Sequence, residues 1–202
     1  MTDTPKISRI AAWQIELPVV GGEYRMSHSK VIQSALTTVV RVETDTGLAG
    51  HGETCPLGAN YLPAYAGGVV PGLAELAPHL LGQNPFELDV LNRVMDSAMK
   101  GQEFVKAPLD VACWDILGQA TGLPVAVLMG GIYQRELPLY YSLTSARPSD
   151  MAEAARVARA QGYRQFQIKC DGNVEADIAR IREVCATREQ DEIFIADANQ
   201  GW

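Results

Sequence analysis

The pattern of apolar and polar residues in the last third of the chain predicts two short strands. Successive side chains of a strand point to opposite faces, so residues 165–170 place two glutamines and Lys169 on one face and apolar side chains on the other. Residues 193–199 alternate in the same way, with polar groups only at the carboxyl end, at Asp197 and Asn199. Both predicted strands therefore carry their chemically reactive side chains where they end.

Segments that favour helix separate these strands. A further strand is predicted over residues 137–143, and residues 149–161 and 174–188 carry helix-forming residues or apolar side chains at helical spacing. The three predicted strands begin at equal intervals along the sequence. Such regular alternation predicts a parallel sheet built from strand–helix units.

Lys169 and Asp197 are expected to lie close together in such a sheet. Neighbouring strands are about 4.8 Å apart, and in barrels of alternating strands and helices the chemistry is done by polar residues at the carboxyl ends of the strands. A lysine that ends a strand is most often a solvated side chain, and Asp197 could instead cap the turn before Gly201. The inward polar face and the neighbouring carboxylate favour a shared site.

The first 54 residues predict a different architecture, an antiparallel sheet. Its strands are predicted over residues 6–17, 36–43 and 48–53. Between the last two, Asp45-Thr46-Gly47 predicts a hairpin turn in which Gly47 adopts a positive φ.

Two loops of this region are candidates for ligand contact. Residues 19–34 include Tyr24 and His28, and a loop of this length in a compact domain is often a lid or a binding loop. Residues 54–63 include Tyr61. The alternative interpretation of the second loop is a plain surface connection.

Three helices are predicted to follow. The first begins at Pro71 and ends near Gly82, and residues 84–87 have the asparagine, proline and glutamate of a capping box for the second. The third covers residues 107–120, where apolar side chains recur at helical spacing, and Gly122 stops it. Its polar residues off this stripe are interpreted as structural.

The composition favours a small-molecule partner. The 202 residues are 47% hydrophobic and 20% charged, and 17 basic against 24 acidic residues give a net charge of −7. No basic run indicates a nucleic-acid or anionic membrane surface, and no signal peptide or long apolar run is present. The four scattered cysteines and three histidines have no metal-ligand spacing. A cytoplasmic protein is therefore predicted.

The order of these features resembles a known family. An antiparallel sheet and helices come first, then APLDVACWDILG at residues 107–118, LMGG at residues 128–131, and the strand–helix units. This order resembles the enolase superfamily, in its mandelate racemase/muconate-lactonizing branch. The resemblance implies an α+β capping domain over residues 1–125 and, over residues 126–202, the start of a (β/α) TIM-type barrel.

Shorter motifs resemble one subgroup of that branch. They are GETCP at residues 52–56 followed by Tyr61, and Gln-Ile-Lys at residues 167–169 where relatives more often have Lys-x-Lys. The subgroup contains proline betaine and hydroxyproline betaine epimerases and hydroxyproline dehydratases. The resemblance implies a Mg²⁺-dependent isomerase that removes the proton α to a carboxylate and racemises or epimerises such a betaine. The alternatives are dehydration of a hydroxyproline or sugar acid by a lyase, and a non-catalytic member that only binds a ligand.

The resemblance also assigns roles to the polar residues of the two strands. Asp197 matches the first of three acidic metal ligands, and Asn199 supports it. Lys169 matches a catalytic base, and a lysine beside a bound cation is expected to have a lowered pKa. Gln167 cannot act as a base and is expected to hydrogen-bond Lys169 or an acid.

Further residues match substrate contacts of the family. Tyr61 matches an aromatic residue that contacts substrate in betaine-acting relatives, where a ring face attracts a quaternary ammonium. Tyr24 and His28 are further substrate-binding candidates. Relatives are commonly oligomeric, so a homo-oligomer is expected.

The length departs from the family pattern. A closed eight-stranded barrel takes about 250 residues, whereas residues 126–202 are enough for three strands. We therefore expect the chain to be the N-terminal part of a longer protein, with the remaining acidic ligands and the second base outside it.

Overall fold

The computed structural model describes residues 4–25, 30–59, 61–199 and 201. The chain forms two compact units, Met1–Leu17 with Ser34–Tyr133, and Pro18–Gln33 with Gln134–Trp202. The second unit thus takes in a segment from the first predicted domain. The predicted domain division after residue 125 remains a prediction, and the compact units change between Tyr133 and Gln134.

The first unit contains the predicted antiparallel sheet. Its strands are β1 (Ile7–Pro18), β4 (Ser34–Thr44) and β5 (Ala49–Thr54), in the order β1–β4–β5. β4 and β5 pair antiparallel, and Gly47 in the turn between them has the expected positive φ, 89°. The predicted hairpin is confirmed.

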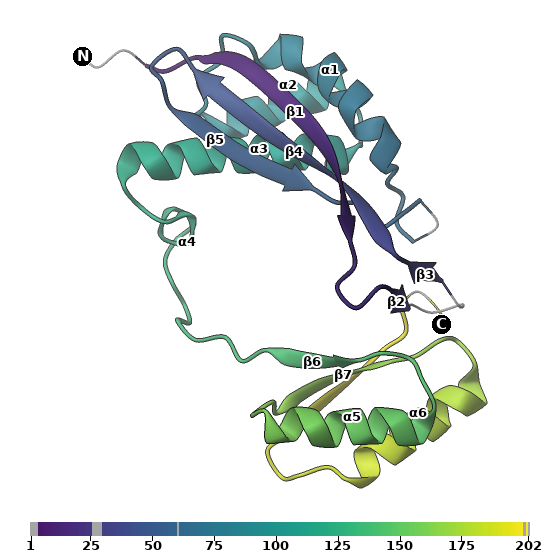
Figure 1. Cartoon of the computed structure of the whole chain (residues 1–202). Coiled ribbons are helices and arrows are strands. Elements are labelled where there is room, and N and C mark those ends of the chain that lie inside the picture. Colours follow the sequence, from purple (N-terminus) through teal and green to yellow (C-terminus); the bar gives the residue numbers. More distant parts are fainter. Residues whose placement is uncertain (1–3, 26–29, 60, 200, 202) are drawn as a thin grey trace. The chain divides into compact units, whose positions relative to one another are not determined.

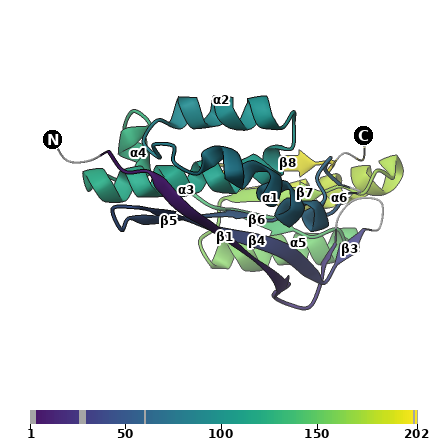
Figure 2. The same cartoon turned by 90° about the horizontal axis from the view of Figure 1, so that it is seen from above.

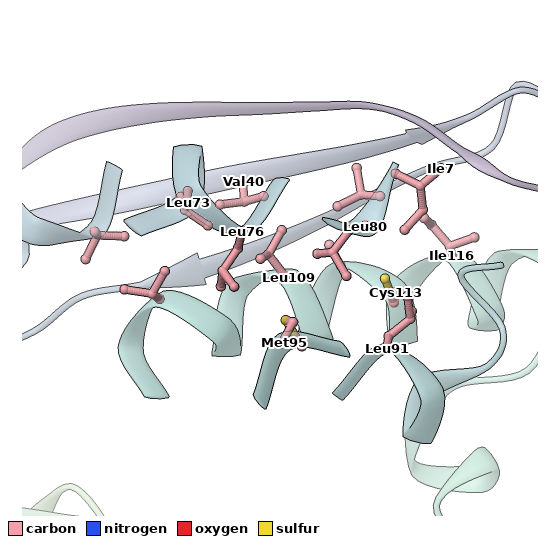
Figure 3. Packing of buried hydrophobic residues seen from close by; sticks show 14 residues of the cluster. Ile7, Val40, Leu73, Leu76, Leu80, Leu91, Met95, Leu109, Cys113 and Ile116 are labelled. Carbon is pink, nitrogen blue, oxygen red and sulfur yellow. The ribbon is translucent and has the colours of Figure 1, made fainter. Parts of the chain in front are cut away.

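Helices cover one face of this sheet (Figures 1 and 2). A 3₁₀ turn (Ala66–Gly68) leads into α1 (Val69–Leu80), which is followed by α2 (Leu88–Ala98), α3 (Glu103–Thr121) and the short α4 (Val125–Leu128). Buried side chains from the sheet and from α1, α2 and α3 form one core, shown in Figure 3. The predicted apolar stripe of α3 faces this core.

The predicted capping box before α2 is wrong. Glu87 is the N-cap residue of α2, and no side chain caps that helix end. The side chain of Asn84 instead accepts a hydrogen bond from the backbone amide of Phe86 at 3.0 Å. Asparagine side chains readily bond the backbone two residues on, which favours a turn over the start of a helix.

β5 and α3 approach each other at backbone distance because β5 has glycines on the face toward the helix. A Cβ atom at Gly52 would lie 2.0 Å from the carbonyl oxygen of Pro108, and one at Gly50 would lie 2.0 Å from that of Ala112. No side chain fits at either position. These glycines therefore set the distance between the sheet and its central helix.

The second unit is a parallel array of strands and helices, as the sequence predicts. Its elements are β6 (Tyr140–Leu143), α5 (Pro148–Ala160), β7 (Gln165–Lys169), α6 (Val174–Ala186) and β8 (Ile193–Asp197). The strand order is β6–β7–β8, and both neighbouring pairs are parallel. The fold is thus an α+β unit followed by the strand–helix alternation with which a barrel begins.

The two faces of this parallel sheet differ. Phe166 and Ile168 of β7 are buried in a core formed with α5 and α6, which lie on that face (Figure 1). The register places Gln167 beside Ile195, and Lys169 beside Asp197, on the other face. β6 begins later than predicted, at Tyr140, which pairs with Gln165, the first residue of β7.

The segment that connects β1 to β4 forms a small hairpin. β2 (Tyr24–Arg25) and β3 (Val31–Ile32) pair antiparallel, with Tyr24 opposite Ile32. The predicted binding loop thus has structure of its own within the second unit. Among the described residues, no helix combines the length and apolar composition needed to cross a membrane.

A buried ion pair joins α5 to the amino end of β8. Arg159 donates from Nη2 to Oε2 of Glu192 at 3.0 Å, and the Glu192 side chain is fully buried. Burial by itself raises the pKa of Glu192, but the hydrogen bonds from Arg159 and from the backbone amide of Glu189 outweigh it and lower the pKa.

Replacement of Glu192 by glutamine is expected to destabilise the protein in a pH-dependent way. Because the folded-state pKa of Glu192 is lowered, its stabilisation is present above the unfolded-state pKa of about 4.3 and is lost as the pH falls through the folded-state value. We expect Glu192→Gln to cost about 3 kcal/mol at about pH 7 and much less near pH 3. Urea unfolding at both pH values measures this, and an equal loss at both would contradict it.

Candidate active site

Lys169 and Asp197 meet at the carboxyl ends of β7 and β8. Lys169 Nζ lies 2.6 Å from Asp197 Oδ2. The lysine side chain is 6% exposed and that of the aspartate is 23% exposed, so the carboxylate opens to solvent while the ammonium is covered. The sequence predicts this juxtaposition, and the structure contains it.

Two neighbours orient the Asp197 carboxylate. Gln167 Nε2 donates to Oδ2 at 2.7 Å, so the predicted bond from Gln167 to an acid is present. The backbone amide of Asn199 donates to Oδ1 at 3.0 Å, and Asn199 has a left-handed φ of 45°. Asparagine tolerates this conformation well. Asp197 therefore also stabilises the turn that follows β8. This is the structural role that the sequence left open as an alternative for Asp197.

Tyr24 brings an aromatic ring to the lysine. Its ring centroid lies 5.7 Å from Lys169 Nζ, at the range of a cation–π contact. Tyr24 belongs to β2, and its segment lies in the same compact unit as Lys169. The structure thus brings together Lys169, Asp197, Gln167, Asn199 and Tyr24.

The Lys169–Asp197 pair favours the charged state of both groups. Burial lowers the pKa of Lys169, but hydrogen bonds and charge interactions with Asp197 and Tyr24 outweigh it, and the pKa is raised. Burial likewise raises the pKa of Asp197, yet the hydrogen bond from Lys169 and those from Asn199 lower it overall. The direction for Lys169 is opposite to that expected beside a bound cation, because here a carboxylate faces the ammonium.

Asp197 is suited to be one ligand of a metal ion. Magnesium prefers oxygen ligands, and the two oxygens of this carboxylate lie at the open end of a parallel strand pair. No group of three or more His, Cys, Asp or Glu side chains suited to a metal ion occurs among the described residues. Among the described residues, the partly open carboxylate of Asp197 fits Mg²⁺ as one oxygen donor.

The two remaining predicted substrate contacts are not tested by this geometry. Tyr61 is half-buried, and its backbone amide donates to the carbonyl oxygen of Gly58 in the loop after β5, within the first unit. His28 lies outside the described residues. Their roles remain predictions.

Sequence reasoning did not single out Ser142. The register places it beside Gln167 on the polar face of the sheet, and its Oγ atom is buried without a hydrogen-bond partner among the residues that the structure describes. The sequence pattern that could have identified Ser142 is the two-residue period of β6, which puts Ser142 and Tyr140 on one face.

Comparisons with known proteins find a family and relatives that are similar to this chain. Residues 12–130 match the family described as "Mandelate racemase / muconate lactonizing enzyme, N-terminal domain". The chain is 44% identical over 197 residues to a cis-3-hydroxy-L-proline dehydratase of Roseibium aggregatum, and 32% identical over 197 residues to an N-succinyl-L-Arg/Lys racemase of Bacillus cereus. A solved structure of an enolase superfamily member from Roseovarius nubinhibens ISM, complexed with magnesium, has a TM-score of 0.88 at 38% identity.

The matches cover nearly all of this chain but only part of each relative. They include 98% of the chain in all three cases, and 54%, 53% and 53% of the dehydratase, the racemase and the solved structure, respectively. The chain thus spans about half the length of the relatives it matches. Both the family match and the two-unit architecture lead to one conclusion: the chain belongs to the mandelate racemase/muconate lactonizing enzyme branch of the enolase superfamily.

Proposed function

We propose that the protein removes the proton α to the carboxylate of a proline-type amino acid, with Lys169 as the base. The observation that carries this proposal is the position of Lys169 Nζ, which is covered from solvent, at the end of β7 and 2.6 Å from a partly open carboxylate. A base must lie within reach of the proton it takes, and the carboxyl ends of parallel strands are where barrel enzymes place such groups.

The proposed step assigns a task to each residue. Lys169 first gives up to solvent the proton that its ion pair with Asp197 favours, and Mg²⁺ held by Asp197 would favour this loss by offsetting the charge of the carboxylate. Neutral Lys169 then accepts the α proton on Nζ, and the electrons of the broken C–H bond move toward the substrate carboxylate. Gln167 and Asn199 hold the Asp197 carboxylate in place through the hydrogen bonds at 2.7 and 3.0 Å. Mg²⁺ held by Asp197 would supply positive charge that stabilises the negative charge developing on the substrate oxygens.

Dehydration of a hydroxyproline is the outcome that we favour. After the α proton has moved to Lys169, the carbon–oxygen bond of the β-hydroxyl breaks, a double bond forms between the α and β carbons, and the hydroxyl leaves as water once an acid has protonated it. This outcome is supported by the 44% identity to a cis-3-hydroxy-L-proline dehydratase. The substrate class is a 3-hydroxyproline.

Racemisation or epimerisation of a proline betaine or hydroxyproline betaine is the second candidate. It begins with the same proton transfer, after which a group on the opposite face returns a proton to the α carbon. The ring of Tyr24 beside the base supports it, because an aromatic face attracts a quaternary ammonium. The racemase from Bacillus cereus, at 32% identity, supports this type of reaction.

Proton exchange in D2O tests the proposal and separates the outcomes. The full-length protein with Mg²⁺ is incubated with cis-3-hydroxy-L-proline, proline betaine, 4-hydroxyproline betaine and a sugar acid, and the α-proton signal is followed by NMR. Loss of that signal from a proline-type compound is expected, with loss of water in mass spectra for dehydration and inverted configuration for epimerisation. Exchange with the sugar acid alone would overturn the assigned substrate class, and no exchange with any compound would overturn the function.

A further inference from the structure

A network of polar contacts holds the loop that directly follows Lys169. The side chain of Asp177, on α6, is 2% exposed and accepts hydrogen bonds from the backbone amides of Asp171 and Gly172, both at 3.0 Å. These amides belong to the loop of residues 170–173, which we call the base loop because Lys169 precedes it. A buried carboxylate thus fixes the backbone two and three residues beyond the proposed base.

Arg180 joins this loop to the neighbouring one. Its guanidinium donates from Nη1 to Asp177 Oδ1 at 2.8 Å, and its Nη2 lies 2.7 Å from Asp171 Oδ2. Its Nε donates to the carbonyl oxygen of Ala146, in the loop after β6, at 3.0 Å. One arginine therefore connects two loops at the carboxyl ends of the strands. Its planar guanidinium has several donors in fixed directions, which suits it to bind three acceptors at once.

The other end of the base loop is fixed as well. The side chain of Asn173 accepts a hydrogen bond from the amide of Ala176 and caps α6. The backbone amide of Cys170 donates to the carbonyl oxygen of Asp197 at 2.9 Å. The base loop is thus held at residue 170 by β8, at residues 171 and 172 by Asp177, and at residue 173 by the helix that it starts.

We infer that Asp177 and Arg180 are positioning residues, which hold Lys169 Nζ in its place beside Asp197 by fixing the base loop. The side chains themselves act only on the backbone and on each other. Because proton transfer is sensitive to displacements of about 1 Å, a loosened base loop lowers the rate of transfer more than it weakens substrate binding. This inference rests on the proposed role of Lys169.

Glu192 provides a matched control for Asp177. Both are buried carboxylates in the same unit, each is paired with an arginine, and each accepts a hydrogen bond from at least one backbone amide. Glu192 precedes β8 and so lies at the amino ends of the strands, whereas Asp177 serves their carboxyl ends. Asp177→Asn and Glu192→Gln remove the same charge at opposite ends of one sheet.

The test compares the two variants in the full-length protein, with thermal unfolding recorded for each. Asp177→Asn is expected to lower kcat for α-proton exchange about 10- to 100-fold, with KM changed less than about threefold. Glu192→Gln is expected to lower the thermal midpoint at least as much and to leave kcat within about twofold. An unchanged kcat in Asp177→Asn, or equal losses of kcat in both variants, would overturn the inference while the proposed function stands.

A second measurement decides the case in which the wild-type protein turns over none of the compounds. Absence of turnover overturns the proposed function, and the placement of Lys169 is then tested without an activity assay. In protein labelled with ¹³C-lysine, the Cε signal of Lys169 is identified by its loss in Lys169→Arg. A shift of that signal in Asp177→Asn but not in Glu192→Gln supports the inference, and no shift or an equal shift in both rejects it.

Discussion

Replacement of Lys169 by arginine is expected to reduce α-proton exchange about 1,000-fold while the fold is kept. Arginine preserves the positive charge that faces Asp197 at 2.6 Å, so the ion pair survives. Its guanidinium stays protonated throughout the accessible pH range and cannot accept a proton. The variant therefore separates the role of Lys169 as a base from its role as a partner of Asp197, which Lys169→Ala would remove together.

Lys106→Arg is the matched control for this variant. Lys106, in the first unit, also has a side chain that is 6% exposed and forms an ion pair, with Asp96 at 2.7 Å. The Lys106→Arg variant is expected to exchange the α proton of the substrate at the wild-type rate. Exchange by Lys169→Arg within about tenfold of wild type would mean that another group is the base, and an equal loss in both variants would mean that arginine perturbs the fold.

Replacement of Gly52 by alanine is expected to prevent the first unit from folding correctly. The added Cβ atom would lie 2.0 Å from the carbonyl oxygen of Pro108, a backbone atom of α3. Relief of this contact requires β5 and α3 to separate, which disrupts the core between the sheet and its helices. We expect a loss of more than about 4 kcal/mol in the free energy of unfolding, measured by urea unfolding.

Gly68→Ala serves as the control for the glycine substitution. A Cβ atom at Gly68 meets only the side chain of Tyr65, at 3.4 Å, which is ordinary contact. Its effect on the free energy of unfolding is expected to be within about 1 kcal/mol. Similar urea midpoints for Gly52→Ala and the wild type would show that sheet and helix can move apart at little cost.

The strands that carry the site could be predicted from the sequence because their signals are local. The two-residue alternation in residues 165–170 and 193–199 specifies which side chains share a face, and the regular spacing of strand and helix segments specifies a parallel order. Once the strands are neighbours, Lys169 and Asp197 must meet. Lys169 and Asp197, the main site candidates from the sequence, are therefore brought together by the backbone geometry of the sheet alone.

Some features could not be predicted from the sequence, because two local structures compete for one side chain or because the contact joins residues that are distant in the chain. At Asn84 a turn and a helix cap use the same side chain, and only their relative energies decide between them. The contact of Tyr24 with Lys169 joins residues that are far apart in the chain. Asp177 and Arg180 look like an ordinary helical pair at i and i+3, and nothing local shows that their partners are loop amides and a carbonyl oxygen.

The placement of the β2–β3 hairpin has a consequence for exchanging parts between relatives. Residues 18–33 belong to the second compact unit although the segments on both sides belong to the first. A chimaera in which residues 34–133 come from a relative keeps Tyr24 with its own Lys169. A chimaera in which residues 1–133 come from a relative places the relative's residue at position 24 beside Lys169. The group that lies beside Lys169 in such hybrids is therefore set by the origin of the short hairpin and not by that of the larger module around it.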